Sequence, residues 1–296
     1  MPQSDRIDFL YIGGHKCGST WLFDMMIQHP QISPCALKEP NFFNMNFDKG
    51  YSYYYSLWKS PGLKGEFSQS YFTSRKALER IHEHNPDVKL IVSLRNPYDR
   101  MISNFIHWNR RNKIENVDFN QYVQDTPAVI NRSLYGKNLK NVFELFKKEN
   151  ILILFFEDIA SRPLSLLKDV YTFLQINAGF VAKNYQKKVG KGFIPRYRLL
   201  EVLRNHVFNY LSAGGMSRTV YLLRSLGLGR FYRMINAKEK SGIQINVSSQ
   251  YSDMLLNDLS QLKQLFSANG LDSHNQYVDS WISWIEKKTG AETVLN

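Results

Sequence analysis

Short apolar runs alternate with segments of helical periodicity through the first 175 residues. Buried strands are predicted at Phe9–Ile12, Val88–Leu94 and Ile151–Phe156, with a shorter one at Lys64–Phe67. Runs of this length, separated by helical segments, are typical of strands buried on both faces of a parallel sheet. The pattern therefore predicts an α/β fold with a central parallel sheet flanked by helices.

The predicted helices lie between these strands, and hydroxyl residues or prolines mark several of their starts. They run from Ser19 to just before Pro30, over Arg75–His84, from Pro97 onward, over Leu139–Glu149, and from Ser161 to about Leu174.

The pattern changes after residue 175. A loop rich in Lys and Gly is expected over Ala178–Tyr197, followed by basic amphipathic segments at Tyr197–Leu211 and Arg218–Ile235. A helix pair is predicted around Met254–Phe266 and Tyr277–Lys287. We therefore expect one domain over 1–296, with an α/β core (1–175) and a mostly helical C-terminal part (176–296).

The composition narrows the class of protein. With 296 residues, of which 43% are hydrophobic and 22% charged, the chain can bury a full core and is unlike disordered sequences. No apolar stretch approaches the ~20 residues that span a bilayer, and no apolar segment opens the sequence. Cys17 and Cys35 are too few for a disulfide framework. We expect a protein of a reducing compartment, the cytoplasm.

Nearly all the excess positive charge lies in one window. The chain carries 38 Lys and Arg against 26 Asp and Glu, and residues 183–240 hold 13 of the basic residues and only two acidic ones. A basic region implies an anionic partner. The basic region 183–240 is open to three interpretations. It holds an anionic glycan, it lies peripherally on an anionic membrane surface, or it forms a solvated helical lid.

A glycine-containing loop, Gly13–Gly18, joins the first strand to the first helix. Strand, loop and helix in this order bind phosphate, because backbone N–H groups at the helix start point at the anion. The loop is not a Walker A motif, since Ser19 stands where that motif has lysine and Lys16 precedes Gly18 by two positions. The sequence therefore predicts a P-loop-like phosphate site, without the features of a magnesium–triphosphate site.

A second phosphate signal follows the strand Val88–Leu94. Arg95 stands at the carboxyl end of this strand, where open α/β sheets bind their ligands. Ser103 lies about two turns into the next helix. The two side chains are predicted to converge on a second anion, with a structural ion pair for Arg95 and a plain helix position for Ser103 as the alternatives.

These motifs together resemble the sulfotransferases that use 3′-phosphoadenylyl sulfate (PAPS), and among them the heparan sulfate and bacterial carbohydrate-type enzymes. The resemblance covers residues 9–159 in motif order. It is carried by HKCGSTWL, KEPNFF, GEFSQSYF, LRNPYDRMISNF and SLYGKNLKNVFELFKKENILILFFEDI.

The resemblance implies the sulfuryl donor and the residues that hold it. Lys16 matches the family lysine that neutralises the leaving group, and Arg95 with Ser103 matches the pair that binds the 3′-phosphate. The remaining nucleotide-binding positions implied by the resemblance are Cys17, Gly18, Ser19, Thr20, Trp21, Lys191 and Gly192. Lys191 and Gly192 preserve only part of the family's later loop, and a solvated basic loop is the alternative there.

Glu39 stands where the related enzymes have their general base. An acceptor hydroxyl or amine must lose a proton as the sulfuryl group arrives, and a carboxylate suits this task. The alternative is that Glu39 only pairs with Lys38 or Lys16. Glu66 is the second candidate for the catalytic set, with orientation or substrate contact as its role and a structural ion pair as the alternative.

The sequence departs from the related glycan enzymes at Phe67, where they tend to carry a lysine beside the sulfuryl group. Either Lys38 compensates, or stabilisation of the transition state depends on Lys16. No His, Cys or carboxylate cluster has metal-ligand spacing, so no metal site is expected.

Three further side chains have candidate chemistry. His15 and His107 are minor candidates for a base, and a packed or exposed position is the alternative for each. Cys17 at a helix start is expected to have a lowered pKa.

The resemblance predicts a PAPS-dependent sulfotransferase, with no metal requirement. The expected acceptor is a hydroxyl or amine of a glycan, a glycolipid or another small metabolite. The aromatic residues of Tyr51–Tyr55 with Phe42, Phe43 and Trp58 either line an acceptor cleft or pack a helix on the core. Two alternatives are a P-loop-type nucleotide kinase or NTPase, and a non-catalytic nucleic-acid-binding protein that uses the basic region 183–240.

Overall fold

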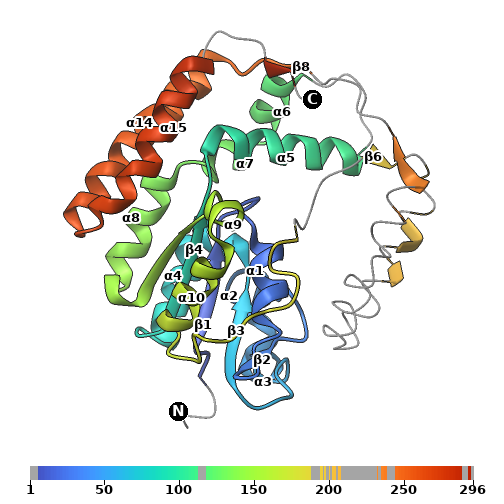
Figure 1. Cartoon of the computed structure of the whole chain (residues 1–296), viewed down its shortest axis with the longest axis vertical. Coiled ribbons are helices and arrows are strands. Elements are labelled where there is room, and N and C mark those ends of the chain that lie inside the picture. The colour runs from blue at the N-terminus through green and yellow to red at the C-terminus, as the bar shows by residue number, and fades with distance from the viewer. Residues whose placement is uncertain are drawn as a thin grey trace.

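Five parallel strands form the central sheet of the computed structural model, in the order β2-β3-β1-β4-β5 (Figure 1). The structure describes residues 6–112, 118–187, 194–195, 197, 200, 202–204, 206–207, 232, 235–238, 244–288 and 293–294. The strands are Phe9–Gly13 (β1), Ile32–Pro34 (β2), Leu63–Phe67 (β3), Lys89–Leu94 (β4) and Ile151–Phe155 (β5). Four of them confirm the predicted strands. β2 was missed because three residues that include a proline give no periodic pattern.

The predicted helices of the first half are also confirmed. They are α1 (Ser19–Met26), α4 (Arg75–His84), α5 (Pro97–Asn112), α8 (Tyr135–Leu145) and α10 (Pro163–Phe173). Shorter helices that the sequence analysis did not predict are α2 (Phe42–Met45), α3 (Gly50–Tyr55), α6 (Phe119–Asp125), α7 (Ala128–Asn131) and α9 (Asp158–Ser161). One-turn 3-10 helices occupy Phe47–Lys49 (η2), Gln69–Thr73 (η3), Lys148–Asn150 (η4) and Asp272–His274 (η5).

The C-terminal part contributes the helix pair α14 (Ser249–Ala268) and α15 (Asn275–Lys288), as predicted but longer. Two small antiparallel pairs accompany it: β6 (Ile194–Pro195) with β7 (Ala237–Lys238), and β8 (Gln244–Ile245) with β9 (Thr293–Val294). The predicted segments Tyr197–Leu211 and Arg218–Ile235 lie largely outside the described residues. Over the described residues, no helix combines the length and the apolar character that crossing a bilayer requires.

The sheet is buried on both faces, because alternate residues of each strand enter different clusters. Leu10 and Ile12 of β1 pack in a core that also contains Leu259 of α14 and Trp281 of α15. Phe9 and Tyr11 pack on the opposite face, with residues of α1 and α10. The helices α8, α14 and α15 lie side by side at the left of Figure 1. The C-terminal helix pair is therefore part of the same hydrophobic core as the sheet.

The strand order reverses at the β1–β4 pair. From β1 the chain continues through β2 and β3 on one side, and β4 and β5 lie on the other. Loops that leave two such neighbouring strands diverge at their carboxyl ends and form a crevice there, which is where open α/β sheets bind ligands. The loop after β1 and Arg95 after β4 both lie at this point.

Helix α8 starts at Tyr135, four residues before its predicted start, because a residue of α14 caps it. The Asp258 carboxylate accepts hydrogen bonds from the backbone N–H of Gly136 at 2.8 Å and of Lys137 at 2.9 Å. Asp258 is 5% exposed. Capping of this kind satisfies amides that a helix start leaves without partners. A cap from a residue so distant in the chain has no signal in the local sequence.

Replacing this cap should destabilise the fold. Asp258→Ala removes both hydrogen bonds and leaves a buried amide at Gly136 and a part-buried one at Lys137 unpaired, so the free energy of unfolding should fall by about 2 kcal/mol. Asn257→Ala, on the exposed face of the same helix, should change it by no more than about 0.5 kcal/mol. Denaturant unfolding of the three proteins measures both effects, and equal stability of Asp258→Ala and the parent protein would contradict the capping role.

Candidate active site

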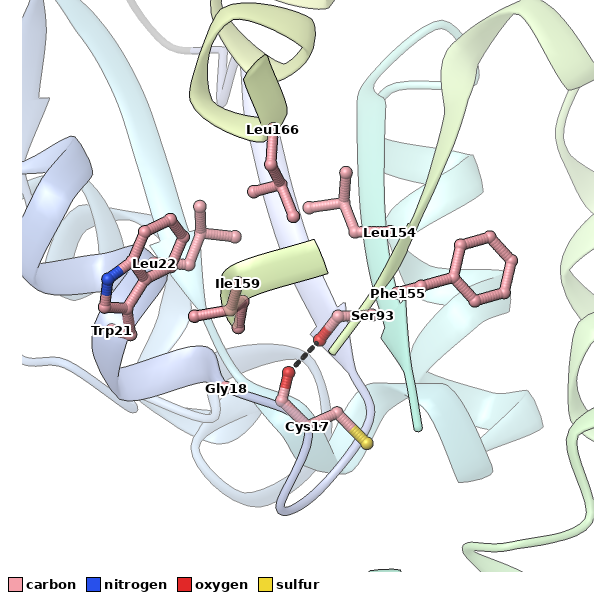
Figure 2. Close-up of a pocket in the computed structure, with 9 residues that line it drawn as sticks. All are labelled: Cys17, Gly18, Trp21, Leu22, Ser93, Leu154, Phe155, Ile159 and Leu166. Carbon is pink, nitrogen blue, oxygen red and sulfur yellow. Dashed lines mark hydrogen bonds between the residues drawn. The ribbon is translucent and has the colours of Figure 1, made fainter. Parts of the chain in front are cut away.

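The loop between β1 and α1 is held by the neighbouring strand β4. Gly14 N–H donates to the Ser93 carbonyl at 2.7 Å. Ser93 Oγ donates to the Cys17 carbonyl at 2.8 Å, as Figure 2 shows. The Tyr11 hydroxyl lies 2.5 Å from Ser93 Oγ and 3.1 Å from the Gly14 carbonyl oxygen. The loop is thus tied to β4 at two points, Gly14 and Cys17.

The start of α1 has the geometry of an anion site. Gly18 precedes the helix with a φ of 91°, and no side-chain hydrogen bond caps α1. A Cβ atom at position 18 would lie 2.2 Å from Cδ1 of Ile159, so only glycine fits there. The N-terminal amides of α1 therefore have no side-chain cap and suit a phosphate group.

A small apolar cavity lies behind the loop (Figure 2). Its lining is almost entirely hydrophobic, so we assign it to packing of the loop and not to an anion. The residues that line it are Cys17, Gly18, Trp21, Leu22, Ser93, Leu154, Phe155, Ile159 and Leu166. The Trp21 indole N–H donates to the Tyr185 carbonyl at 2.8 Å and is thus already used within the protein.

The structure brings Arg95 to the phosphate loop. Its Nη1 atom lies 3.5 Å from the Lys16 carbonyl oxygen, and its guanidinium carbon lies 4.5 Å from the centre of the Phe156 ring. Ser103 is half-buried on α5, about two turns after Arg95. A cation thus stands beside the loop at the β1–β4 crevice, and the role of Ser103 as a phosphate ligand stays a prediction.

Two residues around Arg95 were missed by the sequence analysis. Glu157 accepts hydrogen bonds from Asn96 N–H at 3.2 Å and from the Trp281 indole N–H at 3.0 Å. Burial raises the pKa of Glu157, and the nearby Arg95 opposes that shift. Glu157 follows β5 at the same edge of the sheet, so the rule that singled out Arg95 would have found it. Trp281 comes from α15 and has no local signal.

Lys38 connects Glu39 to the start of α1. Lys38 Nζ donates to Thr20 Oγ1 at 2.7 Å and lies 3.9 Å from Glu39 Oε1. Gln69 Nε2 donates to the same carboxylate oxygen at 2.7 Å. The side chain of Glu39 is 42% exposed. The ion pair with Lys38 is thus present, and it leaves the carboxylate accessible to an acceptor.

Phe67 is buried in an aromatic cluster. Its ring stacks on Tyr11 at 5.1 Å between centroids and meets Phe23 edge-on at 5.3 Å. Lys38 Nζ lies 6.0 Å from the centre of the Phe23 ring. Compensation by Lys38 for the missing lysine stays a prediction, as does stabilisation by Lys16.

Glu66 is fully buried, at 0% exposure. Its carboxylate accepts hydrogen bonds from the hydroxyls of Ser68 and Tyr71, each at 2.5 Å, and from Tyr54. Burial raises its pKa, and these hydrogen bonds oppose that shift. The hydroxyl partners favour orientation over a structural ion pair, and full burial leaves no surface for direct contact with an acceptor.

The remaining candidates differ in their surroundings. Burial, with Arg132 and Arg100 nearby, lowers the pKa of His15 to about 3, so its ring is a poor base near neutral pH. His107 is exposed on α5. The prediction for Cys17 was wrong, because burial raises the pKa of its thiol to about 11 and outweighs the helix start.

Three of the aromatic residues considered for an acceptor cleft pack in the core. Tyr54, Phe42 and Phe43 are each 0% exposed, and the rings of Phe42 and Tyr54 stack at 4.2 Å. The acceptor-cleft interpretation is therefore not supported for these three rings. Lys191 and Gly192 lie outside the described residues.

Known proteins are similar to this chain in sequence. The human heparan sulfate glucosamine 3-O-sulfotransferase 3B1 is 29% identical over 205 residues, which cover 65% of this chain and 51% of that protein. The mouse bifunctional heparan sulfate N-deacetylase/N-sulfotransferase 4 is 28% identical over 192 residues, or 57% of this chain and 22% of that protein. The chain thus spans about half the length, or less, of these relatives.

A solved structure has the same fold. The sulfotransferase from Alicyclobacillus acidocaldarius superimposes with a TM-score of 0.52 at 21% sequence identity, over 73% of this chain and 96% of that one. The family model of the sulfotransferase domain matches residues 6–240, which include the phosphate loop, Glu39, Arg95 and Glu157. With this match over most of its length, the chain belongs to the sulfotransferase family.

Proposed function

We propose that the protein transfers a sulfuryl group from PAPS to a hydroxyl or amine of an acceptor, which is a glycan, a glycolipid or another small metabolite. The observation that carries this proposal is the contact of Arg95 with the Lys16 carbonyl at 3.5 Å. It sets a guanidinium beside the uncapped start of α1, so two anion sites adjoin at one crevice. A nucleotide with separate 3′ and 5′ phosphates needs such a pair of sites. The names of the heparan sulfate relatives support a glycan as acceptor.

The residues of the crevice fit the donor and its leaving group. When bound, PAPS supplies the sulfuryl group and leaves as adenosine 3′,5′-bisphosphate. Negative charge develops on the 5′-phosphate as its bond to the sulfuryl group breaks. This charge would be stabilised by Lys16, the amides of Cys17, Gly18 and Ser19, and the Thr20 hydroxyl. Arg95 would hold the 3′-phosphate, as would Ser103. Fixing both ends of the nucleotide aligns the sulfuryl group for in-line attack.

Glu39 would take the proton of the acceptor. Its carboxylate is accessible, and Lys38 connects it to Thr20 at the start of α1. This arrangement supports the role of Glu39, because it holds a carboxylate and a cation together near the start of α1. The scheme needs no metal ion, because the donor carries a single 5′-phosphate in place of a triphosphate.

Neither alternative function is favoured. The kinase or NTPase hypothesis requires a lysine where Ser19 stands. The nucleic-acid-binding hypothesis accounts for the basic region 183–240 but leaves the contact between Arg95 and the phosphate loop without a purpose.

Calorimetric titration with adenosine 3′,5′-bisphosphate in the presence of EDTA tests the donor site. The parent protein should bind tightly, and Arg95→Ala should weaken binding about 100-fold, since it removes a charge-assisted contact to phosphate. Arg75→Ala is the matched control, because Arg75 forms ion pairs with Glu79 and Glu144 on the surface. Preference for magnesium–ATP over the bisphosphate would overturn the proposal in favour of a kinase.

Glu39→Gln tests the base. The turnover number should fall by about 10²- to 10⁴-fold, while the affinity for adenosine 3′,5′-bisphosphate stays the same, because the amide cannot accept the proton. The assay follows sulfate transfer from PAPS to desulfated heparin oligosaccharides, and sulfate release to water in their absence. Glu79→Gln on the exposed face of α4 is the control. An unchanged turnover number in Glu39→Gln would exclude Glu39 as the base.

We also propose a cytoplasmic location and an anionic membrane surface as a partner of the basic region 183–240. The support for the membrane surface as a partner is the charge of this region, which holds 13 basic and two acidic residues. Several apolar side chains there are also exposed, including Leu203 at 64% and Val207 at 49%.

A liposome assay tests the membrane proposal. Vesicles that contain phosphatidylserine should bind the protein, and binding should fall steeply between low and physiological salt, because exposed charges are screened. Vesicles of phosphatidylcholine alone are the control. Absent binding, or binding that does not respond to salt, would contradict the proposal and favour the glycan or solvated-lid interpretation.

A further inference from the structure

We propose that Glu66, with the hydroxyls of Ser68 and Tyr71, is a positioning device that holds the backbone turn carrying Glu39 in place for proton transfer. We call these three residues the Glu66 cluster. The inference rests on the proposed function, because it gives the cluster the task of placing the proposed base. Glu66 is thereby a positioning residue and does not touch the acceptor.

The two hydroxyls have fixed hydrogen-bond directions. A hydroxyl has one proton to donate, and both Ser68 and Tyr71 donate theirs to Glu66 Oε1 at 2.5 Å. Their lone pairs are then free to accept. Ser68 Oγ accepts from Asn41 N–H at 3.0 Å, and the Tyr71 hydroxyl accepts from Phe43 N–H at 3.0 Å. Each hydroxyl thus connects the buried carboxylate to a backbone amide through two hydrogen bonds.

A third amide completes the turn. Phe42 N–H hydrogen-bonds to the Glu66 carboxylate itself. Three consecutive amides, at positions 41 to 43, are therefore satisfied by the Glu66 cluster. Asn41, the first of them, has a φ of 49°. This backbone conformation costs free energy, and it persists only where the surrounding structure holds it. The buried carboxylate and its hydroxyls provide that enforcement.

The same strand–loop segment, residues 66–71, also supports Glu39, directly through Gln69 and indirectly through Asn41. Asn41 Nδ2 donates to the Glu39 carbonyl at 3.0 Å, and Ser70 Oγ donates to Asn41 Oδ1 at 2.6 Å. Gln69 Nε2 donates to the Glu39 carboxylate. Residues 66–71 thus fix both the backbone around Glu39 and the orientation of its side chain. A displacement of a catalytic group by about 1 Å can lower the rate by about 10²-fold, so the loss of this support should be measurable as a loss of turnover.

Tyr54 provides a matched control within the chain. It also donates its hydroxyl to Glu66, but to Oε2, the other oxygen of the carboxylate. Tyr54→Phe therefore removes a buried hydroxyl–carboxylate bond of the same kind as Tyr71→Phe. The difference is that the Phe43 amide loses its acceptor only in Tyr71→Phe.

The experiment compares Ser68→Ala, Tyr71→Phe and Tyr54→Phe in the sulfate-transfer and sulfate-release assays. Ser68→Ala and Tyr71→Phe should each lower the turnover number by at least about 10-fold, with affinity for adenosine 3′,5′-bisphosphate unchanged within about twofold. Tyr54→Phe should keep the turnover number within about twofold, at a similar loss of thermal stability. An equal loss of turnover in Tyr54→Phe would overturn the proposal, because it would show that the loss of any hydroxyl bond to Glu66 lowers the turnover number.

The same substitutions in a Glu39→Gln background separate positioning from other effects. If the cluster acts through Glu39, Ser68→Ala and Tyr71→Phe should cause no further loss once Glu39 is replaced, since the effects of coupled residues are not additive. A full additional loss there would show that the cluster acts elsewhere. Failure of the proposed function has a different signature, because Glu39→Gln would then leave turnover unchanged or the bisphosphate would not bind.

Discussion

The parallel pairing of β1 with β4 sets the position of the groups that would hold the donor. The pairing aligns Tyr11 with Ile91 and then shifts, so that Gly13 lies opposite Val92. The next residue of β4, Ser93, thereby reaches the loop and ties both Gly14 and Cys17. Arg95 leaves the same strand two residues later. A change in this register would separate the loop from Arg95, because a shift of one residue turns every side chain of a strand to the opposite face.

Buried charge around the crevice is handled by hydrogen bonds from neutral groups. Glu157 is held by a backbone amide and an indole N–H, and Glu66 by three hydroxyls and an amide. A buried carboxylate without such donors would cost several kcal/mol or take up a proton. Neutral donors thus account for most of the stabilisation of these two carboxylates, and Arg95 adds a coulombic contribution at Glu157.

The local sequence predicted the parts of the fold that depend on local patterns. Four of the five strands and the long helices follow from hydrophobic periodicity, and the loop and Arg95 follow from their positions at strand ends. Long-range contacts account for the errors. The start of α8 depends on Asp258, and the support of Glu157 depends on Trp281, each more than a hundred residues away. The pKa of Cys17 depends on burial, which a helix-start rule does not include.

The C-terminal helix pair lies outside residues 6–240, the range that the family shares, yet α15 reaches the crevice through Trp281 and Glu157. For protein engineering, α15 is then not an interchangeable appendage. A chimaera that exchanges the C-terminal segment would also remove the indole that donates to Glu157 beside Arg95, so the end of the chain and the edge of the sheet are physically linked.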